Sequence, residues 1–267
     1  MNDAPVSTAA MIEIEGLAKH YGELVALNAL SLRVERGEIF ALLGPNGAGK
    51  TTTMRVLMGF LKPSAGRARI AGLDCFEQRV ELKRKVGYLP DEPVFYDYLR
   101  GSEIVEFSGD MHGLSRALIR ARATPLIERL ELGPALADYA VNYSRGMKKK
   151  LALVCALLHE PELLILDEPT SGLDPLASRR LNELIVEYRG RGATILLSSH
   201  LLDQVERLCQ RIAIVHGGRV AACGTFEELR QERAQGGTLE DVFFAVTSGD
   251  RELAEAAPAG EARGGGD

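Results

Sequence analysis

Short apolar runs alternate with helical patterns along this chain. Continuous apolar strands are predicted at 39–43, 163–166 and 194–197, and helices at about 50–59 and 176–189. A strand without polar positions is typical of a parallel sheet that is covered on both faces. The alternation of such strands with helices therefore predicts an α/β fold.

The remaining segments give weaker signals. Alternating positions at 11–17 and 32–34 predict two half-buried strands near the start. The segment 98–158 is mostly helical in pattern, with interruptions at Gly113, Pro125 and Gly133-Pro134.

The C-terminal part is predicted from turn and cap residues. Gly217-Gly218, between two apolar stretches, indicates a hairpin, and Thr225 followed by Glu228 has the form of a capping box. A helix is expected over 238–246, and residues 247–267, rich in Gly, Ala and Glu, are expected to be a disordered tail.

Composition limits the classes of partner and of site that the chain is expected to have. The net charge of -5 argues against nucleic acid as the main partner. The longest uncharged apolar run is 151–158, whereas a membrane span needs about 18 residues, and no secretory signal is recognised. The four cysteines are far apart, which favours reduced thiols over a zinc site or disulfides.

A phosphate-binding loop is predicted between a buried strand and a helix. It is Gly44, Pro45, Asn46, Gly47, Ala48, Gly49, Lys50 and Thr51, which match G-x-x-x-x-G-K-[ST]. Its glycines let N–H groups surround phosphates, Lys50 reaches the β- and γ-phosphates, and the Thr51 hydroxyl binds Mg²⁺. The alternative is a tight turn that contains a lysine by chance.

Two adjacent acids follow the apolar strand 163–166. Ligands bind at the carboxyl ends of strands in open α/β sheets, which is where Asp167 and Glu168 stand. Asp167 is predicted to hold Mg²⁺ and Glu168 to deprotonate the attacking water. The alternative is a pair of solvated turn residues.

These motifs occur in a familiar order. GPNGAGKT, YSRGMKKK, LLILDEP, SGLD and the isolated His200 resemble, over residues 11–246, the ATP-binding subunits of ABC transporters. The resemblance implies a P-loop NTPase fold with a mostly parallel central sheet, an antiparallel β subdomain and a helical subdomain at about 96–158. It implies ATP and Mg²⁺ as cofactors and ATP hydrolysis as the activity.

The start of the helix near residue 145 carries an unusual charge. Three lysines, 148–150, fill its first turn, where the helix dipole disfavours cations. The resemblance implies that this segment binds the γ-phosphate of ATP held by a second subunit. The residues concerned, at the place of the family's LSGGQ signature, are Ser144, Arg145, Gly146 and Met147. A nucleic-acid patch is a competing interpretation, and a solvated face is the simpler one.

Single positions can be carried over from the family in the same way. Tyr21 corresponds to the aromatic ring that stacks on adenine, His200 to the switch histidine at the γ-phosphate, and Asp174 to a residue that crosses the dimer interface. Thr52 extends the nucleotide-binding set, and Lys50, Glu168 and His200 form the expected catalytic set. Tyr21 in a packing role and His200 in a structural role are the alternatives.

Asp91 departs from the family pattern, because a glutamine usually stands there. It is predicted to contact Mg²⁺ and water when two subunits close; the alternative is a solvated loop residue.

The sequence therefore predicts an ATPase subunit that forms a head-to-tail homodimer or heterodimer around two Mg·ATP. Separate transmembrane permease subunits are its expected partners, without nucleic acid, and its expected location is cytoplasmic, at the inner face of the membrane. LPDEP and TLEDVFF resemble the branch that exports drugs, antibiotics or lipids. The alternatives are a soluble ABC-type ATPase acting on ribosomes or DNA, and a catalytically silent cassette.

Overall fold

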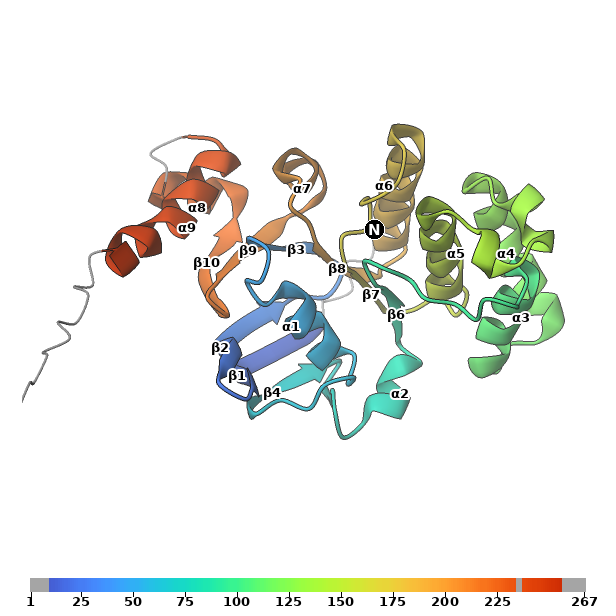
Figure 1. Ribbon diagram of the computed structural model, residues 1–267, viewed down its shortest axis with the longest axis horizontal. Coiled ribbons are helices and arrows are strands. Elements are labelled where there is room, and N and C mark those ends of the chain that lie inside the picture. Colours follow the sequence, from blue (N-terminus) through green and yellow to red (C-terminus); the bar gives the residue numbers. More distant parts are fainter. Residues whose placement is uncertain (1–9, 234–236, 256–267) are drawn as a thin grey trace, which may run out of the picture.

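The computed structural model describes residues 10–233 and 237–255, and a six-stranded sheet runs through its middle (Figure 1). The strand order is β10-β9-β3-β8-β7-β6. The strands are β3 (Ile39–Leu43), β6 (Val86–Leu89), β7 (Leu163–Leu166), β8 (Thr194–Ser198), β9 (Arg211–His216) and β10 (Arg219–Thr225). Only the β9–β10 pair is antiparallel within this sheet, so the predicted, mostly parallel sheet is confirmed.

The central strands are apolar throughout because both of their faces are buried. On β3, Ile39, Ala41 and Leu43 pack into a core shared with helices, whereas Phe40 and Leu42 pack into a second core shared with the other sheet. Successive side chains of a strand point to opposite faces, so two cores require an unbroken apolar run.

The second sheet is antiparallel, with the strand order β2-β1-β4-β5. Its strands are β1 (Ile12–Tyr21), β2 (Leu24–Val34), β4 (Ala65–Ile70) and β5 (Leu73–Asp74). The antiparallel subdomain that the family resemblance implied is thus present. Residues 65–74 gave no sequence signal because only Ala68 and Ile70 of β4 are buried.

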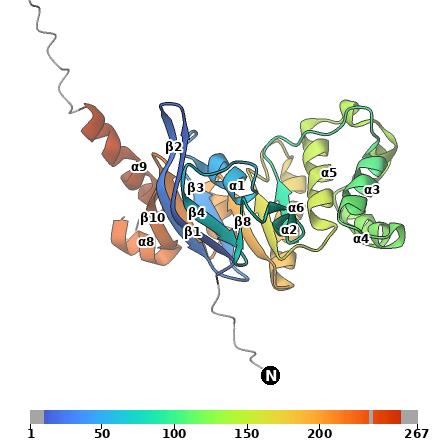
Figure 2. The same cartoon turned by 90° about the horizontal axis from the view of Figure 1, so that it is seen from below.

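Helices cover the six-stranded sheet and extend to both ends of the molecule (Figures 1 and 2). They are α1 (Lys50–Leu57), α2 (Arg79–Lys83), α3 (Gly101–Met111), α4 (Arg116–Arg129), α5 (Arg145–Leu157), α6 (Pro175–Gly190), α7 (Leu202–Leu208), α8 (Phe226–Arg233) and α9 (Leu239–Glu255). Short 3₁₀ turns at Gly133–Ala137 and Ala140–Asn142 precede α5. Helices α3, α4 and α5 lie together at one end, and α8 and α9 at the other.

Helix α4 contradicts the predicted interruption at Pro125, because the helix runs through that residue. Pro125 is exposed, whereas Ile119, Ala123 and Leu126 are buried along one face. The carbonyl group that loses its hydrogen bond at Pro125 belongs to Ala121, which is also exposed, so water can hydrate this group while the buried face packs the helix against its neighbours.

The C-terminal signals are largely matched. Strands β9 and β10 form the predicted hairpin. The Thr225 amide donates to Glu228 Oε2 at 2.7 Å, and the Glu228 amide donates to Thr225 Oγ1 at 3.3 Å. These two reciprocal bonds confirm the capping box. Helix α9 continues to Glu255, beyond the expected boundary at 246. The remainder of the expected tail, 256–267, lies outside the described residues.

Candidate active site

The phosphate loop joins the buried strand β3 to helix α1. Gly49 caps the helix with a φ of 110°, which glycine adopts readily. A Cβ at this position would lie 2.9 Å from the carbonyl oxygen of Ala26 and 2.8 Å from the Leu27 side chain. The sequence therefore needs glycine here, and the turn leaves the first amides of α1 available to an anion.

Lys50 is buried and folds back over this loop. Its Nζ donates to the carbonyl oxygens of Gly44 at 2.6 Å and Pro45 at 3.2 Å. Burial lowers the pKa of the Lys50 ammonium, and the carboxylates of Glu168 and Asp167 oppose this shift. A phosphate group would give the buried ammonium a stronger partner than two neutral carbonyls.

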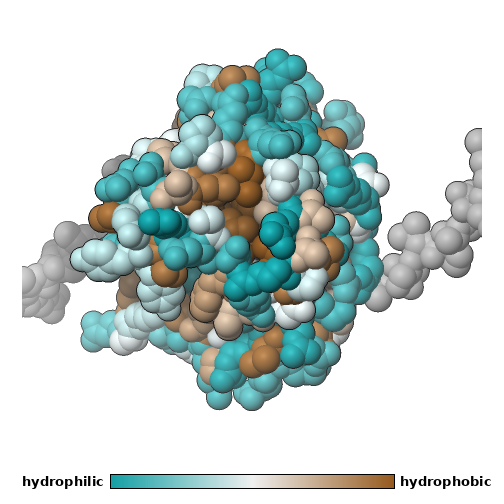
Figure 3. Space-filling view, turned by 90° about the vertical axis from the view of Figure 1, so that its right-hand side faces the viewer, coloured by the Kyte–Doolittle hydropathy of each residue, from teal (hydrophilic) through white to brown (hydrophobic). Residues whose placement is uncertain are grey.

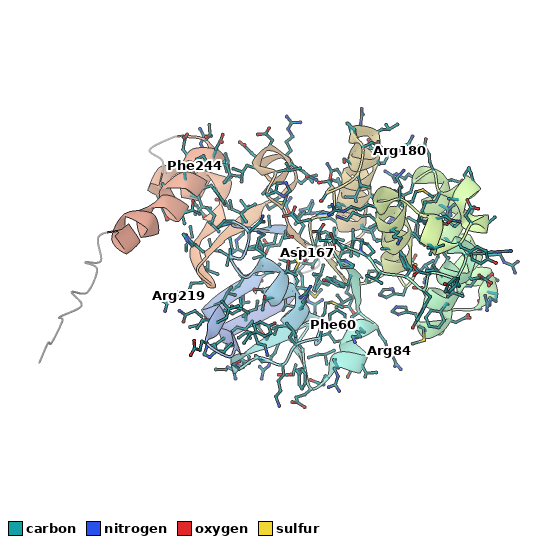
Figure 4. All side chains as sticks on the ribbon, in the orientation of Figure 1. Phe60, Arg84, Asp167, Arg180, Arg219 and Phe244 are labelled. Carbon is teal, nitrogen blue, oxygen red and sulfur yellow. The ribbon has the colours of Figure 1, made fainter. Side chains whose placement is uncertain are left out.

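Two adjoining clefts bring the predicted groups together at the carboxyl ends of β3 and β7. One is lined by Ala26, Asn46, Gly47, Ala48, Gly49, Lys50, Thr51, Thr52, Asp91, Asp167 and Glu168. The other is lined by Gly44, Pro45, Asn46, Asp91, Glu168, Ser171, His200, Leu202 and Phe243. Asp167 lies near the middle of the molecule (Figure 4).

Asp167 is held by a residue that sequence reasoning missed. The carboxylate is buried, and the Ser198 hydroxyl, at the end of the neighbouring strand β8, donates to its Oδ1 at 2.5 Å. The Glu168 amide donates to the same hydroxyl oxygen at 2.9 Å. Ser198 thus orients both acids, and its position after an apolar strand was the signal that could have identified it.

Glu168 has a constrained backbone, and its side-chain carboxylate contacts His200. Its φ is 45°, in the left-handed region that is uncommon for residues other than glycine. Its Oε2 lies 2.8 Å from His200 Nδ1. The structure therefore places a carboxylate and an imidazole beside the phosphate loop, where a water molecule could be deprotonated.

Asp91 lines both clefts, and its carboxylate already pairs with two cationic side chains. Its Oδ1 lies 3.3 Å from Arg145 Nη2 and 3.2 Å from Lys149 Nζ. The role of Asp91 as a metal contact stays a prediction. The interpretation of the three lysines as a solvated face is wrong for Lys149, which is fully buried and ion-paired.

Helix α5 begins at Arg145, directly after Ser144, which is exposed. The Ser144 Oγ accepts a hydrogen bond from the Met147 amide at 3.2 Å, so it is the N-cap. Tyr143 is buried and donates to the Ala135 carbonyl at 2.5 Å, which anchors the segment from behind. A Cβ on Gly146 would lie 3.1 Å from the Gly172 carbonyl oxygen, so this position favours glycine.

Tyr21 and Asp174 lie outside the two clefts described above. Tyr21 ends β1, is 44% exposed, and has Lys19 Nζ 5.2 Å from its ring centroid. Asp174 caps α6 by accepting a hydrogen bond from the Ala177 amide at 2.8 Å, and this bond lowers the pKa of its carboxyl. Their assigned roles stay predictions.

A phosphate loop after β3 of a mostly parallel sheet, with two acids after β7, which is separated from β3 by β8 alone, defines a P-loop nucleoside triphosphatase. Residues 27–171 match the family model described as ABC transporter. The chain belongs to this family, as one of its ATP-binding ATPase subunits. No helix in the described residues is long and apolar enough to cross a membrane.

Similar proteins agree with this assignment. The daunorubicin resistance ATP-binding protein DrrA3 of Streptomyces coeruleorubidus is 40% identical over 233 residues, which are 87% of this chain and 73% of DrrA3. A solved ATP-binding subunit of an ABC transporter is 37% identical with a TM-score of 0.83, covering 88% of this chain and 99% of that one. The structure of cbiO1 from Clostridium perfringens, described as part of the ABC transporter complex cbiONQ, is 30% identical with a TM-score of 0.71, covering 84% and 91%.

Proposed function

We propose that this subunit binds Mg·ATP between two chains arranged head to tail and drives transport through separate membrane subunits. One observation carries the proposal: Ser144 and its helix start are exposed and do not line the cleft that contains Lys50. A phosphate bound at Lys50 would therefore meet the signature segment of a second chain, rather than that of its own.

Magnesium fits the oxygen donors of the cleft. The Thr51 hydroxyl and the Asp167 carboxylate line it together with Lys50. Mg²⁺ prefers oxygen ligands and is commonly held by one or two protein groups together with substrate phosphates. No group of three or more His, Cys, Asp or Glu side chains in the described part of the chain could hold a metal alone, which suits an ion that arrives with the nucleotide. When bound, the ion neutralises charge on the β- and γ-phosphates.

The chain's own groups would then share the chemistry. Lys50 binds the phosphates, Glu168 takes the proton of the attacking water, and His200, beside Glu168, senses the γ-phosphate. Thr52 and Tyr21 complete the nucleotide site, and Asp174 supports the site of the partner across the interface.

Transport requires a contact with a membrane subunit, for which the helical end of the molecule offers an apolar groove. The groove is lined by Val94, Phe95, Tyr96, Leu99, Ile104, Phe107, Ser108, Met111, His112 and Cys155. Val94, Tyr96, Phe107 and Met111 are all at least half exposed. Exposed hydrophobic side chains that gather in this way are typical of an interaction surface. Figure 3, which views this end of the molecule, shows hydrophobic side chains gathered near its centre.

We propose that a cytoplasmic helix of the permease occupies this groove, which would hold the subunit at the inner face of the membrane. The resistance function in the name of DrrA3 favours export of a drug, antibiotic or lipid as the coupled transport.

Met111→Glu is expected to weaken docking of this subunit to the permease. A charge in the groove should lower recovery of the permease in a detergent pull-down by at least about 10-fold, since a buried unpaired charge is strongly disfavoured. Val80→Glu is the matched control, because Val80 and Met111 are both 72% exposed. Mass spectrometry should find an integral membrane protein with the wild type and the control, but not with Met111→Glu. Ribosomes or DNA in the wild-type eluate would instead support the soluble ATPase.

A further inference from the structure

Lys149 is a fully buried lysine that joins three segments of the active site. It lies on α5, and its Nζ is 2.5 Å from the Glu168 carbonyl oxygen, 3.1 Å from the Ser171 carbonyl oxygen and 3.2 Å from Asp91 Oδ1. An ammonium group has three donors, so all of them are used. A buried cation persists only when it is paired and hydrogen-bonded, and Asp91 supplies the opposite charge.

Lys149 contacts Glu168 at a backbone group, the carbonyl oxygen of a residue in a constrained conformation. Glu168 has a left-handed φ of 45°, which a residue with a Cβ keeps only when its surroundings enforce it. Its amide is bonded to Ser198 and its carbonyl to Lys149. Both backbone polar groups of the residue are therefore held by side chains, while its carboxylate stays beside His200.

Asp91 completes the cluster from the loop after β6. Burial lowers the pKa of Lys149, and the hydrogen bond and charge of Asp91 raise it, so Asp91 helps to keep the ammonium charged. Arg145, where the family has a glycine, lies 3.3 Å from the same carboxylate oxygen. Two departures from the family pattern, Asp91 and Arg145, thus meet in one ion cluster.

We propose that Lys149 is a positioning residue that holds Glu168 in its catalytic conformation, and that Asp91 serves as its counter-ion instead of binding Mg²⁺. This inference rests on the proposed role of Glu168 as the base. It links the signature helix to the base within one chain, so that a movement of α5 changes the placement of the attacking water.

Steady-state kinetics test the inference. Lys149→Met keeps the bulk of the side chain but removes its donors, and kcat should fall about 10- to 100-fold, as expected for a slightly misplaced catalytic group. The KM for ATP and the Mg²⁺ concentration at half-maximal rate should stay within about twofold of the wild type, because no substrate contact is lost. Lys149→Arg, which keeps the donors and the charge, should restore part of the rate.

Asp91→Asn should lower kcat less, again without a change in the Mg²⁺ requirement. The double variant Lys149→Met/Asp91→Asn should be no slower than Lys149→Met, because Asp91 then has no lysine to hold. Lys85→Met is the matched control. Lys85 Nζ pairs with Glu162 at 2.6 Å, and this pair lies at the amino ends of β6 and β7, whereas Asp91 and Glu168 follow the carboxyl ends of the same two strands. It should leave kcat unchanged.

Amide hydrogen exchange provides a readout that does not depend on hydrolysis. Lys149→Met should speed exchange of the Glu168, Thr170 and Ser171 amides, since Pro169 has no N–H, and Lys85→Met should not. The Ser171 amide donates to the Glu168 carbonyl at 3.1 Å. Wild-type kcat and exchange in Lys149→Met would overturn the inference. An increased Mg²⁺ requirement in Asp91→Asn, a variant of a partly exposed residue that is expected to fold, would also overturn it and favour the metal contact. A wild-type chain without ATPase activity would count against the proposed function, and the exchange data would still decide the role of Lys149.

Discussion

Replacing Glu168 with Gln is expected to lower kcat for ATP hydrolysis by about 10²- to 10⁴-fold, the usual contribution of a general base. Glutamine has the size of glutamate and can still hydrogen-bond to His200, which lies 2.8 Å from the carboxylate. It cannot accept a proton from water. The KM for ATP should change little, because the phosphate loop and Asp167 remain intact.

The same variant should accumulate as an ATP-bound dimer. Hydrolysis is the step that would end the dimeric state, and loss of a negative charge beside the γ-phosphate removes repulsion. Size-exclusion chromatography with ATP should therefore show a dimer for Glu168→Gln and mostly monomer for the wild type.

Glu160→Gln is a matched control for this prediction. Glu160 is also a glutamate with a left-handed φ, of 51°, but it pairs with Arg122 away from the clefts. This control should hydrolyse ATP like the wild type. Turnover near the wild-type rate in Glu168→Gln itself would exclude Glu168 as the base.

The parts of the site that could be predicted are formed by residues that follow one another in the sequence. Residues 44–51 form the turn after β3 and the first residues of α1, and Asp167 and Glu168 directly follow β7, so local spacing was sufficient to place them. The parallel sheet was predictable for a similar reason: burial on both faces leaves an unbroken apolar run in each central strand.

The parts that were missed depend on tertiary contacts. Lys149 looks like its neighbours in the sequence, and only the packing of α5 against the loops after β6 and β7 buries it and not the other two. Ser198 is an ordinary strand-end serine until β8 pairs with β7 and brings it to Asp167. Strands β4 and β5 were missed because only Ala68 and Ile70 of β4 are buried and β5 is only two residues long, so neither has a clear hydrophobic pattern.

A shared active site would make the activity depend on two chains, which dilution should reveal. If Lys50 of one chain and Ser144 of another act on the same ATP, specific activity should rise with protein concentration until the dimer saturates. Constant activity per chain from nanomolar to micromolar protein would argue for a site that is complete in one chain.

Mixing two inactive variants is expected to restore hydrolysis. Lys50→Ala removes the phosphate-binding ammonium, and Ser144→Arg removes the α5 cap and blocks its exposed start. In a heterodimer of the two, one site combines the intact Lys50 of one chain with the intact Ser144 of the other, and the second site lacks both. Random pairing makes half of the dimers mixed, and each has one intact site of two, so about a quarter of the wild-type activity should return if the sites act independently. The control is Lys50→Ala mixed with the double variant Lys50→Ala/Ser144→Arg, in which no pairing creates an intact site and activity should stay at background. If the first mixture stays as inactive as this control although both variants bind each other, the head-to-tail arrangement is wrong.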